Sequence, residues 1–464
     1  MERADVAIIG GGPAGMAAAH AAASEGADAL VLEKGVPRAD RDGMGPDSTD
    51  AAGILDYWVD LMEIHPDEMP DDVIHQELDR AEFVGPTESC TLTSTGIDSS
   101  YDHFGYTFHR ARFDDWLRER TETAGATYRV GVRVRDVDTD LSASPESDEP
   151  RHRVHTADGE TVGADFVILA DGPQRTVTNQ VLDEYLPAAT TASERLAAPE
   201  VNHIAYQEYR RFPDAVFDEL SSAITFWWGH MPGHTAYPWV FPNENNVCRV
   251  GLTMPIGLDI DAIENREDYP LLEPGDETIP DGETYIRRLL EMEWGDEYDI
   301  ESEFPLVEDH GKRDGTETYS ISSTRPIESP VDAGIAVVGG AMGTTSAFHE
   351  GGDHVAIRSG AIAGELAAAG DLSAYNDRWE TAIGNELVRN VTFADICREY
   401  GPDDWDRTFE TVRGMLTAKG PSLFSIHALR SGFAGLRTYY RYKKRKRQFL
   451  RDGYTQLTEG EYVY

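Results

Sequence analysis

The chain opens with an apolar run that a glycine-rich turn interrupts. Residues 4–9 are mostly apolar, which predicts a buried strand, and the alanine-rich segment after the glycines predicts a helix that extends to about Glu25. A second apolar run, Ala29–Glu33, predicts another strand. The order strand, helix, strand is typical of a βαβ unit.

Further elements follow from the same kind of pattern. Residues 113–124 have the pattern of a helix, and Tyr128–Val137 alternates between polar and apolar positions as a strand does. The polar segment Ser142–Pro150 predicts a turn or the tip of a hairpin, and the glycine, proline and aspartate residues from Gly35 to about Tyr57 predict a loop. Phe166–Ala170 is continuously apolar, which is typical of a strand covered on both faces.

A different pattern occupies residues 200–325. Short alternating segments separated by proline, glycine and asparagine predict an antiparallel sheet there. Gly257–Gly282 is acidic and predicts an exposed insertion. The alternating segments are Ala223–Trp228, Ala236–Phe241 and Cys248–Met254.

The last part of the chain returns to the first pattern. Gly334–Gly339 predicts a buried strand, and a glycine loop leads from it to a helix over Asp353–Ala369. This order indicates that sequence far downstream completes the N-terminal βαβ unit. We therefore expect an α/β fold with a discontinuous Rossmann-like domain (1–60, 101–180 and 326–370), an antiparallel-sheet substrate domain (61–100 and 181–325) and a helical C-terminal region with a basic end (371–464).

The chain is strongly acidic. It has 84 Asp and Glu residues against 41 Lys and Arg, a formal net charge of −43, and the acids are spread along its whole length. Spread acidity destabilises a compact state unless salt screens it, which indicates a halophilic protein from a high-salt cytoplasm. An ordinary acidic protein is the alternative. Nucleic acid is disfavoured as a partner, because such a surface offers no positive field to phosphate.

The cysteines and the apolar runs limit where the protein works. Cys90, Cys248 and Cys397 are far apart and form no metal motif, which excludes a four-cysteine iron–sulfur cluster within the chain and favours buried thiols in a reducing compartment. No run of about eighteen uncharged apolar residues predicts a membrane span, and the alanine-rich start lacks the basic leader of a secretory signal. These features predict a cytoplasmic protein.

Candidate chemistry begins with the glycines after the first strand. Gly10 permits a tight turn, Gly12 lets the backbone approach a pyrophosphate, and Gly15 allows close packing of helix on strand. The helix N-terminus then offers N–H groups to a diphosphate, and Glu33 ends the second strand where a carboxylate accepts from ribose hydroxyls. A glycine turn without a ligand is the alternative, and the motif fits both FAD and NAD. The expected contacts in this segment are Gly10, Gly12, Pro13, Ala14, Gly15, Glu33 and Lys34.

Three further segments resemble the para-hydroxybenzoate-hydroxylase-like flavoprotein superfamily. Residues 109–117 are similar to its R-x-x-F-D-x-x-L segment, and 167–177 are similar to its A-D-G-x-x-S/T-x-V motif. Residues 336–343, followed by the sequence EGG at 350–352, resemble its third motif. The resemblance implies FAD as the cofactor and further cofactor contacts at Arg110, Asp171, Gly172, Gly339, Gly340, Gly351 and Gly352.

The resemblance also implies roles for these residues. Arg110 would reach the cofactor as a cationic fork, with a surface ion pair to a neighbouring acid as the alternative. Asp171 would lie beneath the adenosine–pyrophosphate region, and the helix start near Gly351 would direct N–H groups at the flavin edge where negative charge builds on reduction. Gly340 departs from the family, which has Asp at this place. One contact to the ribityl chain is therefore lost or supplied by a neighbour such as Glu350.

Residues 237–242 resemble the Y-x-W-x-F-P segment of geranylgeranyl reductases. Tyr237, Trp239 and Phe241 would point to one face of a strand and form a wall for a polyprenyl chain. An ordinary sheet core is the alternative. The resemblance implies a flavoenzyme that reduces C=C bonds of a polyprenyl (geranylgeranyl) lipid or a quinone side chain. Its electron donor would be a reduced nicotinamide, ferredoxin or a flavoprotein.

The reaction would add a hydride and a proton to the two alkene carbons. An isolated alkene is weakly polarised, so the protein must supply position and a dry site. His349, Glu350 and His354 lie on the segment expected near the flavin ring and are the candidate catalytic residues. A structural role is the alternative for the two histidines.

Two features favour other functions. The segment Asp40–Gly53 lacks the cysteine common in geranylgeranyl reductases, and residues 352–356 resemble a stretch of the electron-transfer-flavoprotein:quinone oxidoreductases. A cluster-less dehydrogenase of that type, which passes electrons to quinone, is therefore one alternative. A flavin-fold binding protein without turnover is another.

Residues 437–451 form a basic segment with interleaved tyrosines. It contains Lys443, Lys444 and Lys446, half of the lysines in the chain. Cations and tyrosines together predict peripheral contact with the inner face of a membrane. A counter-charge that docks on the protein's own acidic surface is the alternative.

Overall fold

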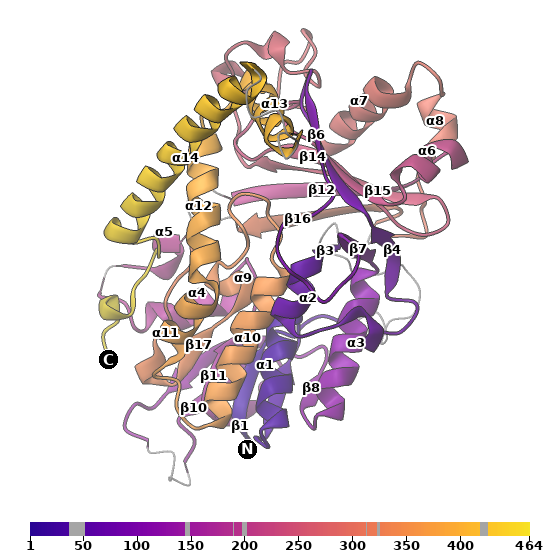
Figure 1. The fold of residues 1–464 in the computed structure, drawn as a ribbon. Helices are drawn as coiled ribbons and strands as arrows, with labels where there is room; N and C mark the ends of the chain where they lie inside the picture. The colour runs from indigo at the N-terminus through magenta and orange to yellow at the C-terminus, as the bar shows by residue number, and fades with distance from the viewer. Residues whose placement is uncertain are drawn as a thin grey trace.

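The computed structural model describes residues 1–36, 52–143, 149–188, 190–196, 202–311, 313–322, 325–417 and 426–464, with the backbone alone at 202, 322, 415, 417 and 426–438. The described residues form two seven-stranded sheets, called sheet A and sheet C, and a three-stranded sheet B. Sheet A lies next to the N-terminus, sheet C lies at the far end of the molecule, and long C-terminal helices run between the two ends (Figure 1). The expected α/β class is confirmed.

Sheet A has the strand order β8-β2-β1-β11-β10-β9, and β17 also pairs with β11. The pairs from β8 to β11 and the pair β11–β17 are parallel, whereas β10 is antiparallel to both β11 and β9. The pairing of β17 with β11 confirms that distant sequence completes the first unit. The strands are β1 Glu2–Ile9, β2 Ala29–Leu32, β8 Thr127–Arg129, β9 Val134–Thr139, β10 His152–Thr156, β11 Thr161–Leu169 and β17 Ile335–Val337.

Two helices pack against each other beside sheet A with their backbones nearly in contact. They are α1 (Pro13–Ser24) and α10 (Asp353–Ala368). A Cβ atom on Gly360 would collide with the carbonyl oxygen of Ala14, and one on Gly364 would collide with that of Ala18. The spacing of four residues on both helices keeps one small-residue stripe in register with the other. This contact places the start of α10 beside the start of α1.

Sheet C has the order β16-β12-β15-β14-β13-β5-β6. Its neighbours are antiparallel, as the alternating segments predict, except for the parallel pair β13–β5. Helix α7 (Gly282–Trp294) packs with one face of the sheet through an apolar core. The strands are β5 Arg80–Val84, β6 Ser89–Leu92, β12 Asn202–Arg211, β13 Ala223–Trp227, β14 Tyr237–Pro242, β15 Val247–Pro255 and β16 Thr316–Ser322.

Sheet B and several short helices connect the two large sheets. Sheet B consists of β3 (Gly53–Leu55), β7 (Gly105–Phe108) and β4 (Ile74–Leu78), all antiparallel. The remaining helices before α10 are α2 Asp56–Met62, α3 Arg110–Thr123, α4 Thr176–Asp183, α5 Ala192–Leu196, α6 Asp214–Leu220, α8 Ile300–Glu303 and α9 Gly339–Met342. Short 3₁₀ turns lie at Pro66–Glu68, Ile260–Ala262, Arg266–Asp268, Val331–Ala333 and Glu459–Glu461.

The C-terminal region is helical, as expected. It contains α11 Tyr375–Trp379, a π turn at Glu380–Gly384, α12 Asn385–Cys397, α13 Pro402–Thr417 and α14 Ile426–Asp452. The segment after α14 returns to the neighbourhood of sheet A, where Leu457 pairs with Ile327 and the Tyr462 hydroxyl donates to Glu328. The segment that follows the basic helix is therefore held on the fold. Among the helices of the described residues, none is both long and apolar enough to cross a bilayer.

Several local predictions need correction. The expected strand Tyr128–Val137 is two strands, β8 and β9, because a turn separates residues paired with β2 from residues paired with β10. The loop expected up to about Tyr57 instead ends in β3 and the start of α2, while residues 37–51 lie outside the described part. The acidic segment Gly257–Gly282 is mostly exposed, but Leu271 and Leu272 are buried in the core beneath it. The three cysteines are free and buried, as predicted.

Candidate active site

Three glycine segments meet where the parallel strands of sheet A end. Gly10 follows β1, Gly172 follows β11, and Gly339 follows β17. A Cβ on Gly10 would collide with the carbonyl oxygen of Ala170, one on Gly339 would lie 2.6 Å from the Ala14 Cβ, and one on Gly340 would lie 3.1 Å from Pro173. The expected cofactor glycines are therefore brought together at the carboxyl edge of the sheet, where ligands bind in open α/β sheets.

Gly12 differs from its neighbours in having open space around it. A Cβ at Gly12 would meet no atom within 4 Å, whereas one at Gly15 would collide with the Gly10 carbonyl oxygen. Gly12 is also the N-cap of α1, and no side chain caps this helix end. Pro13 and Ala14 occupy its first turn, where Pro costs no hydrogen bond. The first-turn N–H groups thus face a region that side chains leave open.

Glu33 lies beside the first glycine loop. Its carboxylate accepts from the backbone N–H of Gly11 at 2.6 Å and from that of Gly35. These bonds fix the carboxylate at the end of β2, and each oxygen keeps a second lone pair for a further donor. Lys34, the next residue, is exposed.

Asp171 caps a helix in this structure. Its carboxylate accepts from the N–H of Val177 at 2.6 Å, from the N–H of Thr178 at 3.1 Å and from the Thr178 hydroxyl, and so satisfies the start of α4. A Cβ on Gly172 would have open space around it, as at Gly12. At Gly340 the space is limited by Pro173, which gives a local reason for glycine where the family has aspartate.

Arg110 is buried and paired with two acids. Its Nε lies 2.9 Å from Asp114 Oδ1, and its Nη1 lies 3.3 Å from Asp353 Oδ1. The neighbouring acid of the alternative interpretation is therefore present, but the pair is not a surface pair, because Arg110 is 6% exposed. The pairing ties the start of α3 to the first residue of α10.

The start of α10 lies beside the glycine segments. Gly352 is its N-cap, no side chain caps it, and Ala356 in the first turn lies against Gly339. Glu350, just before Gly351, has a φ of +61°, a conformation that costs a non-glycine residue of order 1–3 kcal/mol.

The Glu350 carboxylate faces sheet C rather than the glycine loops. It contacts His203 Nδ1 on β12 and accepts a hydrogen bond from the Thr253 hydroxyl on β15. The His203 side chain is 0% exposed and that of Glu350 is 4% exposed. The expectation that Glu350 replaces the aspartate missing at Gly340 therefore needs correction: its carboxylate contacts sheet C instead.

The two candidate histidines of this segment form a second cluster with Trp58 and Glu386. The His354 ring stacks on Trp58 with centroids 4.0 Å apart, and its Nε2 lies 2.6 Å from Glu386 Oε1. Burial lowers the pKa of His354, and burial together with the neighbouring His354 lowers that of His349 to about 4. Burial alone would raise the pKa of Glu386, but His354 and Arg389 outweigh it and lower it to about 2. At neutral pH both histidines are therefore uncharged and Glu386 is a carboxylate.

The three aromatic residues of β14 point to one face of sheet C, as predicted. Tyr237, Trp239 and Phe241 belong to an apolar cluster between this face and the C-terminal helices, whereas Val240 belongs to the core on the other face. The Tyr237 hydroxyl donates to the His349 carbonyl at 2.6 Å, and Trp228 stacks on the Tyr237 ring at 4.2 Å. The aromatic wall thus touches the loop that precedes α10.

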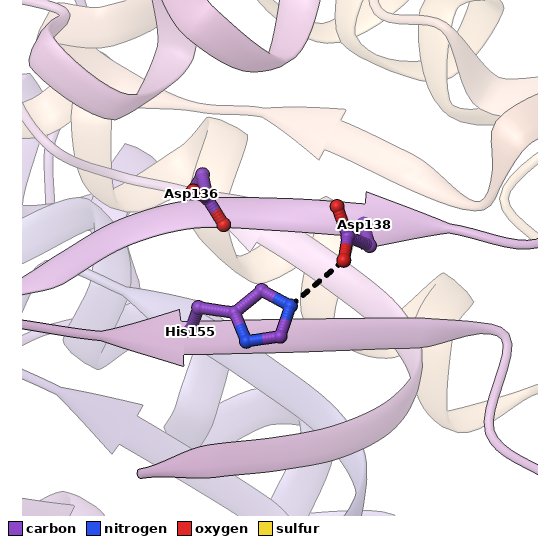
Figure 2. A group of neighbouring side chains, drawn as sticks. All are labelled: Asp136, Asp138 and His155. Atoms are coloured by element: carbon purple, nitrogen blue, oxygen red, sulfur yellow. Dashed lines mark hydrogen bonds and ion pairs between the residues drawn. The ribbon is translucent and has the colours of Figure 1, made fainter. Parts of the chain in front are cut away.

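A separate group of polar residues lies elsewhere on sheet A. Asp136 and Asp138 on β9 lie near His155 on β10 (Figure 2). His155 Nε2 lies 2.9 Å from Asp138 and its Nδ1 lies 3.1 Å from Thr161, so both ring nitrogens have protein partners. The group is next to the start of β11, at the opposite end of the strand from the glycine segments.

Sequence reasoning missed several partners in this region. His203, Thr253, Trp58 and Glu386 contact the candidate residues, yet they stand on strands and helices distant in the chain. Asp114 was within reach of prediction, because it lies four residues after Arg110 in the same segment. For His203, Thr253, Trp58 and Glu386, no local sequence motif predicts the contact.

FAD fits this arrangement on two structural observations. The Cβ positions of Gly12 and Gly172 are open at the carboxyl edge of sheet A, so backbone can approach a ligand there. The helices that start at this edge, α1 and α10, have N-termini without side-chain caps, which suits a diphosphate and the electron-rich edge of a flavin.

Comparison with known proteins agrees with this picture. Residues 5–79 match the model of a family described as FAD binding domain. The chain is 27% identical over 429 residues to digeranylgeranylglycerophospholipid reductase 2 of Methanopyrus kandleri, covering 88% of this chain and 90% of the relative. It is 24% identical over 408 residues to menaquinone reductase of Mycolicibacterium smegmatis, covering 84% and 83%.

The fold also occurs among solved structures. A geranylgeranyl bacteriochlorophyll reductase-like protein of Thermoplasma acidophilum superimposes with a TM-score of 0.65 at 21% identity, covering 89% of this chain and 92% of that one. The resemblance stated from the sequence motifs and the expectation of FAD are confirmed. The protein is therefore an FAD-dependent oxidoreductase, similar over most of its length to digeranylgeranylglycerophospholipid reductases.

Proposed function

We propose that the enzyme reduces C=C bonds of a polyprenyl chain carried by a geranylgeranyl lipid. The observation that carries this proposal is the aromatic wall of Tyr237, Trp239 and Phe241, which contacts the loop at the start of α10 through the Tyr237 hydroxyl. Relatives named for reductases of such lipids cover most of the chain and support it.

Residues at the carboxyl edge of sheet A would hold FAD in this proposal. The N–H groups after Gly12 would bind the diphosphate, Glu33 would accept from the ribose, and Asp171 would fix the adjoining loop by capping α4. Arg110 and the α10 start at Gly351 and Gly352 would border the flavin. Bound FAD supplies the hydride that the alkene receives.

The domain assignment follows the sheets. Every strand of sheet A falls within residues 1–60, 101–180 and 326–370, which we assign to the cofactor. Every strand of sheet C falls within 61–100 and 181–325, which we assign to the substrate. Between the two domains, the protein must orient an apolar chain and exclude water, because an uncharged alkene cannot be bound through ion pairs or hydrogen bonds.

Replacement of Trp239 by leucine tests the substrate wall. Trp239→Leu is expected to raise KM for a geranylgeranyl lipid by about 10-fold or more, because a large apolar contact is lost, while the flavin absorbance stays unchanged. Trp227→Leu is the matched control, since Trp227 is equally buried in the core on the other face of sheet C. Equal KM values for the two variants would rule out the wall.

A quinone is the second candidate substrate, favoured by the relative named menaquinone reductase. Two reactions are then distinguished. In the first, a double bond of the quinone side chain is saturated, as in the main proposal. In the second, the quinone ring takes the electrons, as in the cluster-less dehydrogenase. Enzyme reduced with dithionite and mixed with menaquinone decides by mass spectrometry: a gain of two hydrogens in the side chain supports the reductase, and quinol alone supports the dehydrogenase.

We further propose that the outer face of α14 rests on an anionic membrane surface. The inner face of the helix is occupied: Arg445 pairs with Asp395 at 2.7 Å, Arg441 pairs with Glu399 at 3.2 Å, and Tyr442 stacks on Phe393. These contacts agree with the counter-charge interpretation for that face. Helix α14 lies on the outside of the molecule (Figure 1). Its outer face presents the exposed residues Tyr439, Tyr440, Lys443, Lys444, Arg447 and Leu450.

Point substitutions test this contact better than truncation, because the segment after α14 packs near sheet A. The triple change Lys443→Gln, Lys444→Gln and Arg447→Gln is expected to lower binding to phosphatidylglycerol vesicles by about 10-fold or more, at about 1 kcal/mol per cation before screening. The measurement is vesicle flotation at the lowest KCl concentration that keeps the protein folded. Arg135→Gln, Arg287→Gln and Arg407→Gln remove the same charge from other exposed sites. If both triple variants float alike, α14 makes no specific contact.

A further inference from the structure

We infer that His234, His203 and Glu350 form a proton relay that leads from the protein surface to the aromatic wall and supplies the proton for alkene reduction. The inference rests on the proposed function and adds a proton route and two residues to it. Its evidence is a line of three neighbouring titratable side chains that runs from the largely buried loop between β13 and β14, where His234 is partly exposed, to the loop before α10.

The inner pair of the relay is Glu350 and His203. His203 Nδ1 contacts Glu350 Oε1, and the Thr253 hydroxyl donates to Glu350 Oε2 and lies 3.4 Å from His203 Nδ1. Both side chains are almost fully buried. A buried imidazole and a carboxyl group in direct contact can pass a proton from one to the other without solvent between them, so this contact is the inner step of the relay.

His234 connects this pair with the outside. Its ring centroid lies 5.2 Å from that of His203, a separation that a direct contact or one water molecule spans. His203 Nε2, the nitrogen that does not face Glu350, has no hydrogen-bond partner among the described residues. His234 is partly exposed, and burial, the neighbouring His203 and the exposed Arg398 together lower its pKa to about 4, so it passes protons as a neutral imidazole. An imidazole can accept a proton at one nitrogen while it donates from the other, which makes His203 the middle step.

The inner end of the relay lies at the proposed reaction site. Glu350 directly precedes the two glycines at the start of α10, and its backbone is held in the left-handed region. Burial raises the pKa of the Tyr237 phenol in the aromatic wall, and the negative charge of Glu350 raises it further. Among the described residues, Thr253 contacts the inner pair from sheet C, the charge of Glu350 acts on Tyr237, and Arg398 just after α12 acts on His234.

The reaction balances with this relay. One alkene carbon gains a hydride through FAD; its two electrons come from the external reductant (a reduced nicotinamide, ferredoxin or a flavoprotein), and its hydrogen comes from that reductant or from water. The other carbon gains a proton from the Glu350 carboxyl group, and the C=C bond becomes a single bond. His203 returns a proton to Glu350, and His234 recovers one from water. No other oxidant or reductant is needed.

The experiment compares His203→Gln and His234→Gln with the wild type in single turnover. Enzyme reduced with dithionite is mixed with a geranylgeranyl lipid, and saturation of the lipid is followed by mass spectrometry. Each variant is expected to slow this step by about 10-fold or more, within the usual range for a lost proton-transfer group, and to leave flavin reduction unchanged. Imidazole added to His234→Ala is expected to restore the rate. His230→Gln, a buried histidine of the same loop, serves as the control.

A second readout does not depend on turnover. In FAD-free protein, exchange of the His203 ring proton with water, measured by NMR, is expected to slow about 10-fold in His234→Gln, because the outer transfer group is gone. Wild-type rates in His234→Gln for both lipid reduction and proton exchange would overturn the relay, even if His203→Gln failed to fold. A wild-type enzyme that leaves the lipid unchanged would instead overturn the proposed function, and the exchange rate would then decide the relay by itself.

Discussion

Gly12→Val is expected to leave the fold intact and to weaken FAD binding by about 100-fold or more, equivalent to about 2.7 kcal/mol. The structure separates the two effects. A side chain at Gly12 would meet no protein atom within 4 Å, and its φ of −78° suits any residue, so nothing in the fold resists valine. The same side chain would stand in front of the uncapped first turn of α1, where the diphosphate must approach the backbone.

The measurement is a titration of the FAD-free protein with FAD, followed by flavin fluorescence, with thermal unfolding recorded in parallel. Gly275→Val is the matched control, because a Cβ at that exposed glycine also meets no atom within 4 Å. Gly15→Val gives the contrast, since its Cβ would collide with the Gly10 carbonyl oxygen and lower stability as well. If Gly12→Val binds FAD as tightly as Gly275→Val, the diphosphate is held elsewhere.

The elements that the sequence predicts well are those whose pattern is local. The continuous apolar runs of β1 and β11 and the glycine turn after β1 are local signals, because a strand covered on both faces must be apolar throughout. The face of β14 is another, since alternate residues of any strand point to the same side. Tyr237, Trp239 and Phe241 therefore fall in one cluster as expected.

The contacts that the sequence does not predict join segments far apart in the chain. Glu350 and His203 are 147 positions apart, and neither lies in a sequence motif that predicts a contact with the other. His354 and Glu386 meet only because the tertiary fold brings the start of α10 near the start of α12. Arg110 lies between these cases: its partner Asp114 is local, but Asp353 and the burial of the pair depend on the tertiary fold.

The boundary between β8 and β9 was lost for a related reason. The alternation of polar and apolar residues continues across the turn, and Gly131, with a φ of +70°, is the local sign of the break within Tyr128–Val137. The break arises because β8 pairs with β2 and β9 pairs with β10, on different strands of sheet A. Pairing partners are a property of the sheet, and single-strand periodicity carries no information about them.

Salt is expected to change the stability of this protein more than any single substitution outside the glycine loop. We expect its thermal midpoint to rise by about 15 °C or more between 0.2 M and 3 M KCl. The reason is the surplus of acids, 84 against 41 basic residues, which repel one another in the compact state. The screening length is about 10 Å at 0.1 M salt and about 3 Å at 1 M, so only the nearest charges still interact at high salt.

The controls must separate screening from the general stabilisation that excluded solutes give. Sucrose stabilises proteins because it is excluded from their surface, but it does not screen charge. It is therefore expected to raise the thermal midpoint much less than KCl does. A variant with fewer repelling charges provides the second control: Glu264→Gln, Glu267→Gln, Asp268→Asn and Glu277→Gln remove exposed acids of the segment Gly257–Gly282. This variant is expected to be more stable than the wild type in 0.2 M KCl and equal to it in 3 M KCl. A midpoint that does not depend on KCl in the wild type would mean that the acidity is ordinary and that the protein is not adapted to high salt.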